Sequence, residues 1–167
     1  MDTWAKIWQD ATYNYTSKLI KEPKNNENGV SFKVQYNLPN NEATVFVNYL
    51  ISNNGNLKLK LNYKNGILNG ISENYFINGK LERRTSFNNG NIDGFDEFYY
   101  VNGNLKIKTP YKDDMVHGTS KIFYNNGQVM SLITYKNDER AGVHEEYDMN
   151  GNLTLMEYYL DDNIVEK

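Results

Sequence analysis

One spacing constrains this chain more than any other feature: several series of residues recur along it every 24 positions. The first series is an Asn-Gly dipeptide, found at Asn54-Gly55, Asn78-Gly79, Asn102-Gly103, Asn126-Gly127 and Asn150-Gly151. The second is a lone glycine, found at Gly70, Gly94, Gly118 and Gly142. Self-similarity at a short fixed period indicates a repeat architecture, in which each unit packs only on its neighbours.

Aromatic and aliphatic residues follow the same period. One aromatic series is Tyr63, Phe87, Tyr111, Tyr135 and Tyr159, and a second is Tyr75, Tyr99, Phe123 and Tyr147. An aliphatic series is Leu57, Leu81, Leu105, Val129 and Leu153. We expect these residues to hold the repeat together, because large side chains in neighbouring strands can bridge from one unit to the next.

Each unit reads as a β-hairpin. The stretch "ISENYFI" at 71–77 and the stretch "KLERRTSF" at 80–87 are strand-length and rich in β-formers, and Asn-Gly between them is a strong hairpin signal. We therefore predict an all-β fold: an elongated antiparallel β-meander of 24-residue hairpin repeats, with a short N-terminal α-helix. Strand alternation assigns residues 71, 73, 75 and 81, 83, 85, 87 to one regular face, and a variable series to the other. That variable series is Arg84, Lys108, Leu132 and Met156.

Residues 1–45 lack the repeat and are expected to cap it, while 46–167 form about five units. Trp4, Trp8 and the following apolar residues up to Leu19 recur at helical spacing, which predicts a helix over about 3–20. A linker over 21–29 and a first strand over 30–38 would follow. The helix has two interpretations, as an end cap or as a segment that docks on a partner or membrane.

No residue set indicates catalysis. The chain has no cysteine, and its two histidines, His117 and His144, lack the companions of a metal site. His117 falls at a turn, and His144 shares a strand face with Glu146. No phosphate-binding loop or nucleophile–base motif is present in the sequence. We therefore expect a protein that is not an enzyme and needs no cofactor or metal.

Charge is distributed unevenly along the chain. Residues 138–167 carry nine acids and two bases, which leaves −7, whereas residues 1–137 carry +4. Glu145, Glu146 and Asp148 lie in this acidic part. Such a segment either solvates the end of the sheet or pairs with a basic protein surface. The candidate partner-binding residues are Arg84, Lys108, Leu132, Met156, Glu145, Glu146, Asp148, Trp4 and Trp8.

The repeat resembles the MORN repeat, in the bacterial form found in YwqK-type antitoxin proteins. The resemblance rests on "YFINGKLERRTSFNNGNIDG", "YYVNGNLKIKTPYKDDMVHG" and "FYNNGQVMSLITYKNDERAG", and it covers about 46–167. It implies a protein partner, such as a toxin, effector or nuclease, whose active site this chain occludes. Asp114, Asp138 and Asp162 depart from the pattern by replacing the turn glycine of Gly66 and Gly90, so those turns are expected to differ in geometry.

Two other functions stay open at this point. One is a MORN-type scaffold or membrane-associated structural protein, which the mild net charge of −3 disfavours for a membrane. The other is a mobile-element inhibitor of a host defence nuclease. We expect no direct nucleic-acid partner, while open sheet edges would allow a homodimer. The N-terminal stretch lacks signal-peptide features, so a bacterial cytoplasmic location is expected unless the chain is a trimmed, secreted form.

Overall fold

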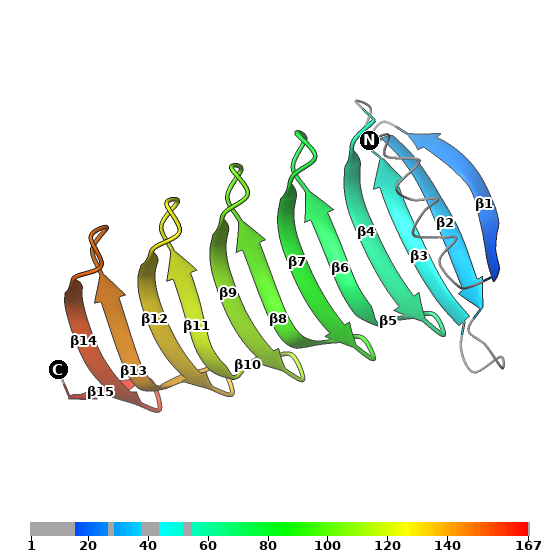
Figure 1. Ribbon diagram of the computed structural model, residues 1–167. Coiled ribbons are helices and arrows are strands. Elements are labelled where there is room, and N and C mark those ends of the chain that lie inside the picture. The colour runs from blue at the N-terminus through cyan, green and yellow to red at the C-terminus, as the bar shows by residue number, and fades with distance from the viewer. Residues whose placement is uncertain (1–15, 27–28, 38–43, 52–54, 167) are drawn as a thin grey trace. The chain divides into compact units, whose positions relative to one another are not determined.

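The computed structural model describes residues 16–26, 29–37, 44–51 and 55–166. The chain divides into an N-terminal unit, Met1–Leu81 with Phe87–Gly90, and a C-terminal unit, Glu82–Ser86 with Asn91–Lys167. Within the described residues all regular elements are strands, which confirms the all-β antiparallel hairpin prediction (Figure 1).

The N-terminal unit contains β1 (Thr16–Asn26), β2 (Gly29–Asn37), β3 (Thr44–Ile51), β4 (Leu57–Lys64), β5 (Ile67–Leu68) and β6 (Gly70–Tyr75). These strands pair antiparallel in the order β1–β2–β3–β4–β6, with β5 paired to β4. Strand β7 (Leu81–Asn88) has residues in both units.

The C-terminal unit continues with β8 (Asn91–Tyr99), β9 (Leu105–Lys112), β10 (Met115–Val116), β11 (Gly118–Phe123), β12 (Val129–Lys136), β13 (Glu139–Tyr147), β14 (Leu153–Leu160) and β15 (Asn163–Glu166). The order β8–β9–β11–β12–β13–β14–β15 follows the chain, and β10 pairs with β9. Apart from the two-residue β10, each strand therefore bonds to the strands next to it in the sequence, as a hairpin repeat requires.

The N-terminal prediction needs correction. Thr16–Asn26 form strand β1, so the expected helix is wrong for 16–20 and the expected linker is wrong for 21–26. The rest of that helix, with Trp4 and Trp8, lies outside the described residues. The first predicted strand is confirmed as β2, which pairs with both β1 and β3. Pairing with the exposed edge of β2 outweighs the local helical pattern in this segment.

Two kinds of turn alternate along the repeat. In the Asn78-Gly79 turn, Gly79 N donates to Phe76 O at 2.9 Å and Phe76 N donates to Lys80 O at 2.8 Å. Only the glycine has a positive φ there, 82°, so this is a three-residue loop and not the two-residue turn that Asn-Gly suggests. In the Asn89-Gly90 turn both residues have positive φ, 49° and 94°, as in a type I′ turn.

The aspartate turns keep the glycine geometry, so the expectation of a different geometry is wrong. Asp113 and Asp114 have φ of 49° and 67°, in the same left-handed region as Asn89 and Gly90. Asp114 N donates to Ile92 O at 2.9 Å, and Asp114 Oδ1 accepts from Ile92 N at 2.6 Å. Asp138 and Asp162 bond in the same way to Val116 and Arg140. The carboxylate therefore ties each turn to the preceding repeat, which offsets the left-handed strain.

The lone glycines also need positive φ, between 92° and 113°. A Cβ on Gly118 would lie 3.1 Å from Pro110 Cγ, and one on Gly94 would lie 3.0 Å from Ser86 Cβ. Gly118 and Gly142 pair across strands with Tyr135 and Tyr159. Conformation and close approach together explain this glycine series.

Over residues 50–51 and 55–165, where side-chain burial is described, the sheet has few buried apolar side chains. Those buried are the apolar Ile51 and Tyr159 and the polar Ser72, Thr85, Asp96, Ser120, Ser131 and Glu157. Backbone ladders and cross-strand side-chain contacts must therefore supply much of the stability.

Candidate functional site

One face of the C-terminal unit is a grid of three rows, which we call the open face. Cross-strand pairing and strand alternation give its rows. The middle row is Glu97, Lys108, Lys121, Leu132, Glu145 and Met156. The flanking rows are Phe95, Pro110, Thr119, Thr134, Val143 and Tyr158, and Tyr99, Leu105, Phe123, Val129, Tyr147 and Leu153. The opposite side, which carries Asp96 and His144, we call the packed face.

The grid corrects the sequence-based assignment of faces. Tyr147 donates its hydroxyl to Glu145, which lies beside Leu132 and Met156, so the series of Tyr99, Phe123 and Tyr147 shares a face with the variable series. Tyr159 instead donates to Glu157 on the packed face. The cause is a register shift beside the Asn-Gly turns at 54, 102, 126 and 150. Glu146 pairs with Leu155 and Tyr147 with Leu153, so one extra residue on β14 breaks the simple alternation.

Lysine and glutamate side chains are held in place at the β8–β9 part of the open face. Lys108 Nζ lies 2.9 Å from Glu97 Oε1 and 3.9 Å from the centre of the Phe95 ring. Tyr99 donates its hydroxyl to the same Glu97 at 3.0 Å. Arg84 follows the packed-face Arg83 on β7 and therefore points to the open face. The arrangement presents oriented charges between aromatic rings.

The acidic candidates separate into three environments. Glu145 lies on the open face, and its bond from Tyr147 raises the pKa of that tyrosine. Glu146 lies on the packed face, 3.4 Å from His144 Nε2. Asp148 caps the final Asn-Gly turn, where bonds from Asn152 and the turn backbone lower its pKa. Only Glu145 therefore joins Lys108, Leu132 and Met156 on one surface.

Sequence reasoning missed an ion pair on the packed face. Arg83 Nε and Nη2 bind both oxygens of Asp96, each at 2.9 Å, and Thr85 Oγ1 donates to Asp96 at 2.7 Å. Asp96 is 4% exposed, and the Arg83 guanidinium lies 4.8 Å from the Phe98 ring centre. These bonds raise the pKa of Arg83. The sequence does carry a signal for this pair, because both charges depart from their 24-residue series. The series of Arg83 has Leu59, Ile107, Ser131 and Leu155 at its other positions, and that of Asp96 has Ser72, Ser120 and His144.

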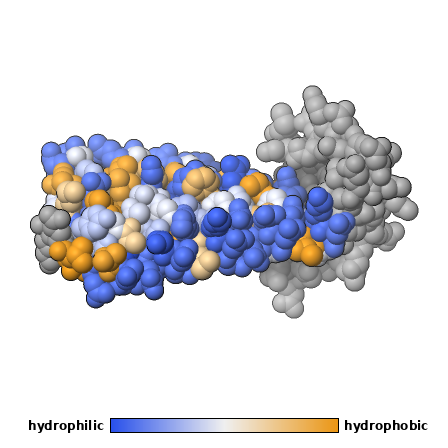
Figure 2. Space-filling model, turned by 90° about the horizontal axis from the view of Figure 1, so that it is seen from below, coloured by the Kyte–Doolittle hydropathy of each residue, from blue (hydrophilic) through white to orange (hydrophobic). Residues whose placement is uncertain are grey.

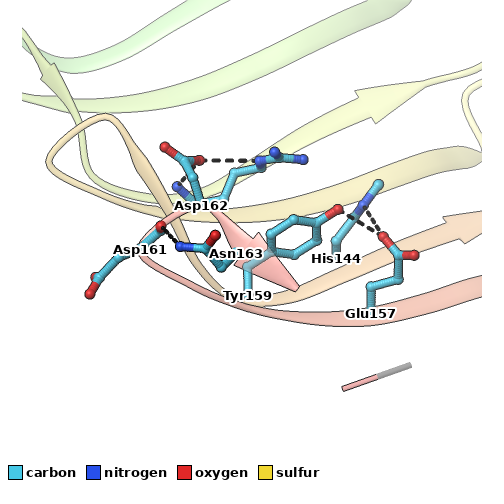
Figure 3. Close-up of polar contacts among 7 residues, drawn as sticks. His144, Glu157, Tyr159, Asp161, Asp162 and Asn163 are labelled. Carbon is cyan, nitrogen blue, oxygen red and sulfur yellow. Dashed lines mark hydrogen bonds and ion pairs between the residues drawn. The ribbon is translucent and has the colours of Figure 1, made fainter. Parts of the chain in front are cut away.

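A second polar cluster, shown in Figure 3, lies on the packed face of β13 and β14. Tyr159 donates its hydroxyl to Glu157 at 2.8 Å, which raises the pKa of Tyr159, and His144 points to the same carboxylate with Nδ1 at 4.0 Å. Arg140 lies 4.2 Å from the Tyr159 ring centre and pairs with Asp162. His144 and Glu146 share a face as predicted. His117 is exposed at a turn, where it bonds Asn137.

Exposed apolar side chains gather near the C-terminal end of the described chain (Figure 2). The members are Leu153, Met156, Tyr158, Leu160, Ile164 and Val165. Met156, 53% exposed, belongs to the middle row of the open face. Apolar groups thus lie beside the acidic ones of the same strands, as at many protein-binding surfaces.

A family model described as a MORN repeat variant matches residues 68–89, 97–113 and 116–137. The chain carries MORN repeats. The three matches end at residues 89, 113 and 137, 24 residues apart, and lie on the hairpins described above. MORN repeats generally act as scaffolds that bind proteins or membranes. No curated protein matches the chain significantly.

Two searches of the described residues, for metal-ligand groups and for membrane-spanning helices, found neither. No group of three or more His, Cys, Asp or Glu side chains among the described residues is placed to hold a metal ion. None of the described residues forms a helix long and apolar enough to cross a membrane.

Proposed function

We propose that this protein is a non-catalytic binding module that inhibits a partner protein by covering its active site, as an antitoxin or immunity protein does. The observation that carries the proposal is the open face of the C-terminal unit. There a charged middle row runs between two rows with apolar and aromatic members, on strands held by backbone ladders.

Two features of the open face suit tight association. The Tyr99 and Tyr147 hydroxyls already bind Glu97 and Glu145, and Lys108 is fixed between Glu97 and Phe95, so few rotamers remain to be ordered on binding. Leu132 and Met156 add apolar contact area next to these charges. A rigid, aromatic-rich surface of this kind is typical of protein recognition sites.

Site-specific crosslinking in the native host tests the proposal. A photoreactive residue at Met156 should capture one defined protein, whereas the same residue at the adjacent Leu155, on the packed face, should not. The captured protein should be toxic when expressed alone, and co-expression of this chain should relieve that toxicity. If position 156 captures no defined protein, or if the captured protein's activity is unaffected by this chain, the proposal is wrong.

The same experiment separates the other candidates. A captured host nuclease that belongs to a defence system would indicate a mobile-element inhibitor. A scaffold on anionic lipid would instead float with liposomes at low salt and lose that binding at high salt. Flotation together with no protein capture would replace the inhibitor proposal with the membrane scaffold.

A further inference from the structure

One hairpin of the open face departs from the repeat at two positions. Lys121, in the middle row, belongs to a 24-residue series that is otherwise acidic: Glu73, Glu97 and Glu145. Phe123, two residues further along the same strand, belongs to a series that otherwise has a hydroxyl: Tyr75, Tyr99 and Tyr147. The hairpin has therefore exchanged an acid for a base and a tyrosine for a phenylalanine together.

The two departures belong to one structural unit. In the three hairpins that have the glutamate, the tyrosine two residues on donates its hydroxyl to that glutamate, at 2.9–3.0 Å. Phe123 has no hydroxyl, so the hairpin that lost the acceptor has also lost the donor. No polar group is left without its partner, and the lysine is accommodated beside an apolar ring.

Lys121 also faces another lysine. Strands β9 and β11 are adjacent in the sheet (Figure 1), and Lys108 and Lys121 are cross-strand partners there. Two periods earlier, the same pair of positions holds the opposite charges of Lys60 and Glu73. Opposite charges directly across a ladder stabilise a sheet, whereas like charges destabilise it. The exchange at Lys121 is therefore unfavourable for the free sheet.

The neighbours of Lys121 do not neutralise it. Its other cross-strand partner, Leu132, is apolar. Glu97 is engaged on both sides, because it binds Lys108 Nζ at 2.9 Å and accepts the Tyr99 hydroxyl. The Lys121 side chain is exposed, and within the described part of the chain it makes no hydrogen bond or ion pair. An unpaired cation thus lies on the face that the proposed function assigns to the partner.

We propose that Lys108 and Lys121 form a site for a carboxylate of the protein partner, from an aspartate or glutamate side chain. This inference rests on the proposed function and adds the chemistry of its anchor. The guest carboxylate supplies the charge that glutamate supplies at this position in other units. It accepts from the two ammonium groups, and the Thr119 hydroxyl on the same face is a further donor. Phe95 and Phe123 flank the site, and the partner's cover strengthens the ion pairs by excluding water.

The row favours one carboxylate over a nucleic acid as the guest. Glu97 and Glu145 lie on the same row, one on each side of the two lysines. A nucleic-acid strand carries a charge at every phosphate and would meet these glutamates as well. A single carboxylate meets the lysines alone.

Nuclear magnetic resonance of the full chain at low salt tests the site. The probe is glutamate blocked as its N-acetyl α-amide, and the equally blocked glutamine is its neutral match. The glutamate probe should shift the Lys121 and Phe123 signals in a saturable way, and the glutamine probe should not. Equal shifts from both probes, or tighter binding of oligothymidine than of the glutamate probe, would overturn the inference.

Two variants with the same change of charge locate the site. Lys121→Glu should abolish the shift caused by the glutamate probe. Lys112→Glu changes an exposed lysine at the end of β9, opposite Met115, and should retain that shift. Equal effects of the two variants would show a response to overall charge, and the carboxylate site would be wrong.

Restoring the repeat pattern separates binding from folding. The double variant Lys121→Glu with Phe123→Tyr recreates the glutamate–tyrosine pair and places a carboxylate opposite Lys108. Its melting temperature should rise by about 1–3 °C, because a repulsive cross-strand pair becomes attractive, while binding of the glutamate probe is lost. Loss of binding together with a lower melting temperature would show that Lys121 serves the fold, and the inference would fail.

A partner captured at position 156 distinguishes this inference from the proposed function. Lys121→Glu should lower the affinity for that partner at least about tenfold, whereas Lys112→Glu should change it less than about twofold. If the two variants bind that partner equally well, the carboxylate site is wrong and the inhibitor proposal stands. If the glutamate probe binds as expected but no partner is captured, the carboxylate site stands and the inhibitor proposal falls.

Discussion

At the scale of single residues, a charged side chain is buried in a sheet that has few buried apolar side chains around it. Asp96 is buried and receives three hydrogen bonds, two from Arg83 and one from Thr85. The bonds satisfy the carboxylate, so the pair is tolerated there. The sequence did not predict this pair. Arg83 and Asp96 each depart from a different 24-residue series, and only the strand register brings the two side chains together.

The first prediction concerns this carboxylate. Asp96→Ala should lower the free energy of unfolding by about 2–3 kcal/mol, because Arg83 and Thr85 lose their shared acceptor. Urea denaturation followed by circular dichroism measures the change. Asp93→Ala, on the same strand β8, serves as the control and should change it by less than about 0.5 kcal/mol. Equal losses in the two variants would contradict this account of Asp96.

The second prediction is a pH dependence. Backbone and side-chain bonds from Arg140 lower the pKa of Asp162 below its ordinary 3.8. A lowered carboxyl pKa means that the folded state binds the proton less readily than the unfolded state. The stabilisation is therefore present above the ordinary pKa of the carboxyl group, and it is lost as the pH falls through the lower pKa of Asp162 in the folded state. Asp162→Asn should flatten the fall of the melting temperature between about pH 5 and 2. Asp161→Asn, one residue earlier, should leave that fall unchanged.

At the scale of elements, the 24-residue period correctly predicted where nearly every hairpin lies in the sequence. It did not predict which face of the sheet each residue occupies. Strands β6 to β14 lie where the recurring glycines and aromatics predicted them. The predicted faces were wrong, because an extra residue after the Asn-Gly turns at 54, 102, 126 and 150 changes the alternation, and no residue type marks it in the sequence. Strand β1 was missed for a different reason, since its pairing with β2 is a contact between segments.

Glycine positions within these elements give the third prediction. Gly118 and Gly127 both have positive φ, 113° and 90°, yet a Cβ on Gly118 meets Pro110 at 3.1 Å and one on Gly127 meets nothing within 4 Å. Gly127→Ala should cost about 1 kcal/mol of left-handed strain, and Gly118→Ala should cost about 2–3 kcal/mol because a clash is added. Chemical denaturation of the two variants compares them. A similar cost for both would show that the close approach is unimportant.

At the scale of the whole molecule, hydrogen bonds between neighbouring hairpins recur every 24 residues, at the sequence period. The Tyr100 hydroxyl donates to Phe123 O and the Tyr124 hydroxyl donates to Tyr147 O, both at 2.8 Å. With the aspartate turns, these bonds join each hairpin to the next. The sequence predicted this modular organisation, because a fixed 24-residue period implies identical units that contact their neighbours in the same way. It could not predict the buried ion pair of Arg83 and Asp96, because that pair depends on departures from the period.

Modularity gives the fourth prediction. Deletion of residues 118–141, one whole period, joins His117 to Gly142 and lets Asp162 take the place of Asp138. That variant should fold with a similar circular dichroism spectrum, because each strand contacts only its neighbours. Deletion of residues 118–140, one residue fewer, shifts the register and should give a protein that melts at least about 10 °C lower or does not fold. Equal behaviour of the two deletions would contradict the modular organisation.

The scarcity of buried apolar side chains in the described sheet has a thermal consequence. Heat capacity rises on unfolding mainly because apolar surface becomes hydrated, while exposure of polar groups lowers it. With Ile51 and Tyr159 as the buried apolar members among residues 50–51 and 55–165, that part of the sheet has little such surface to expose. Calorimetry should therefore give a heat-capacity increment per residue below the usual ~12–15 cal/mol/K, and hence a shallow stability curve that changes little between cold and warm growth conditions.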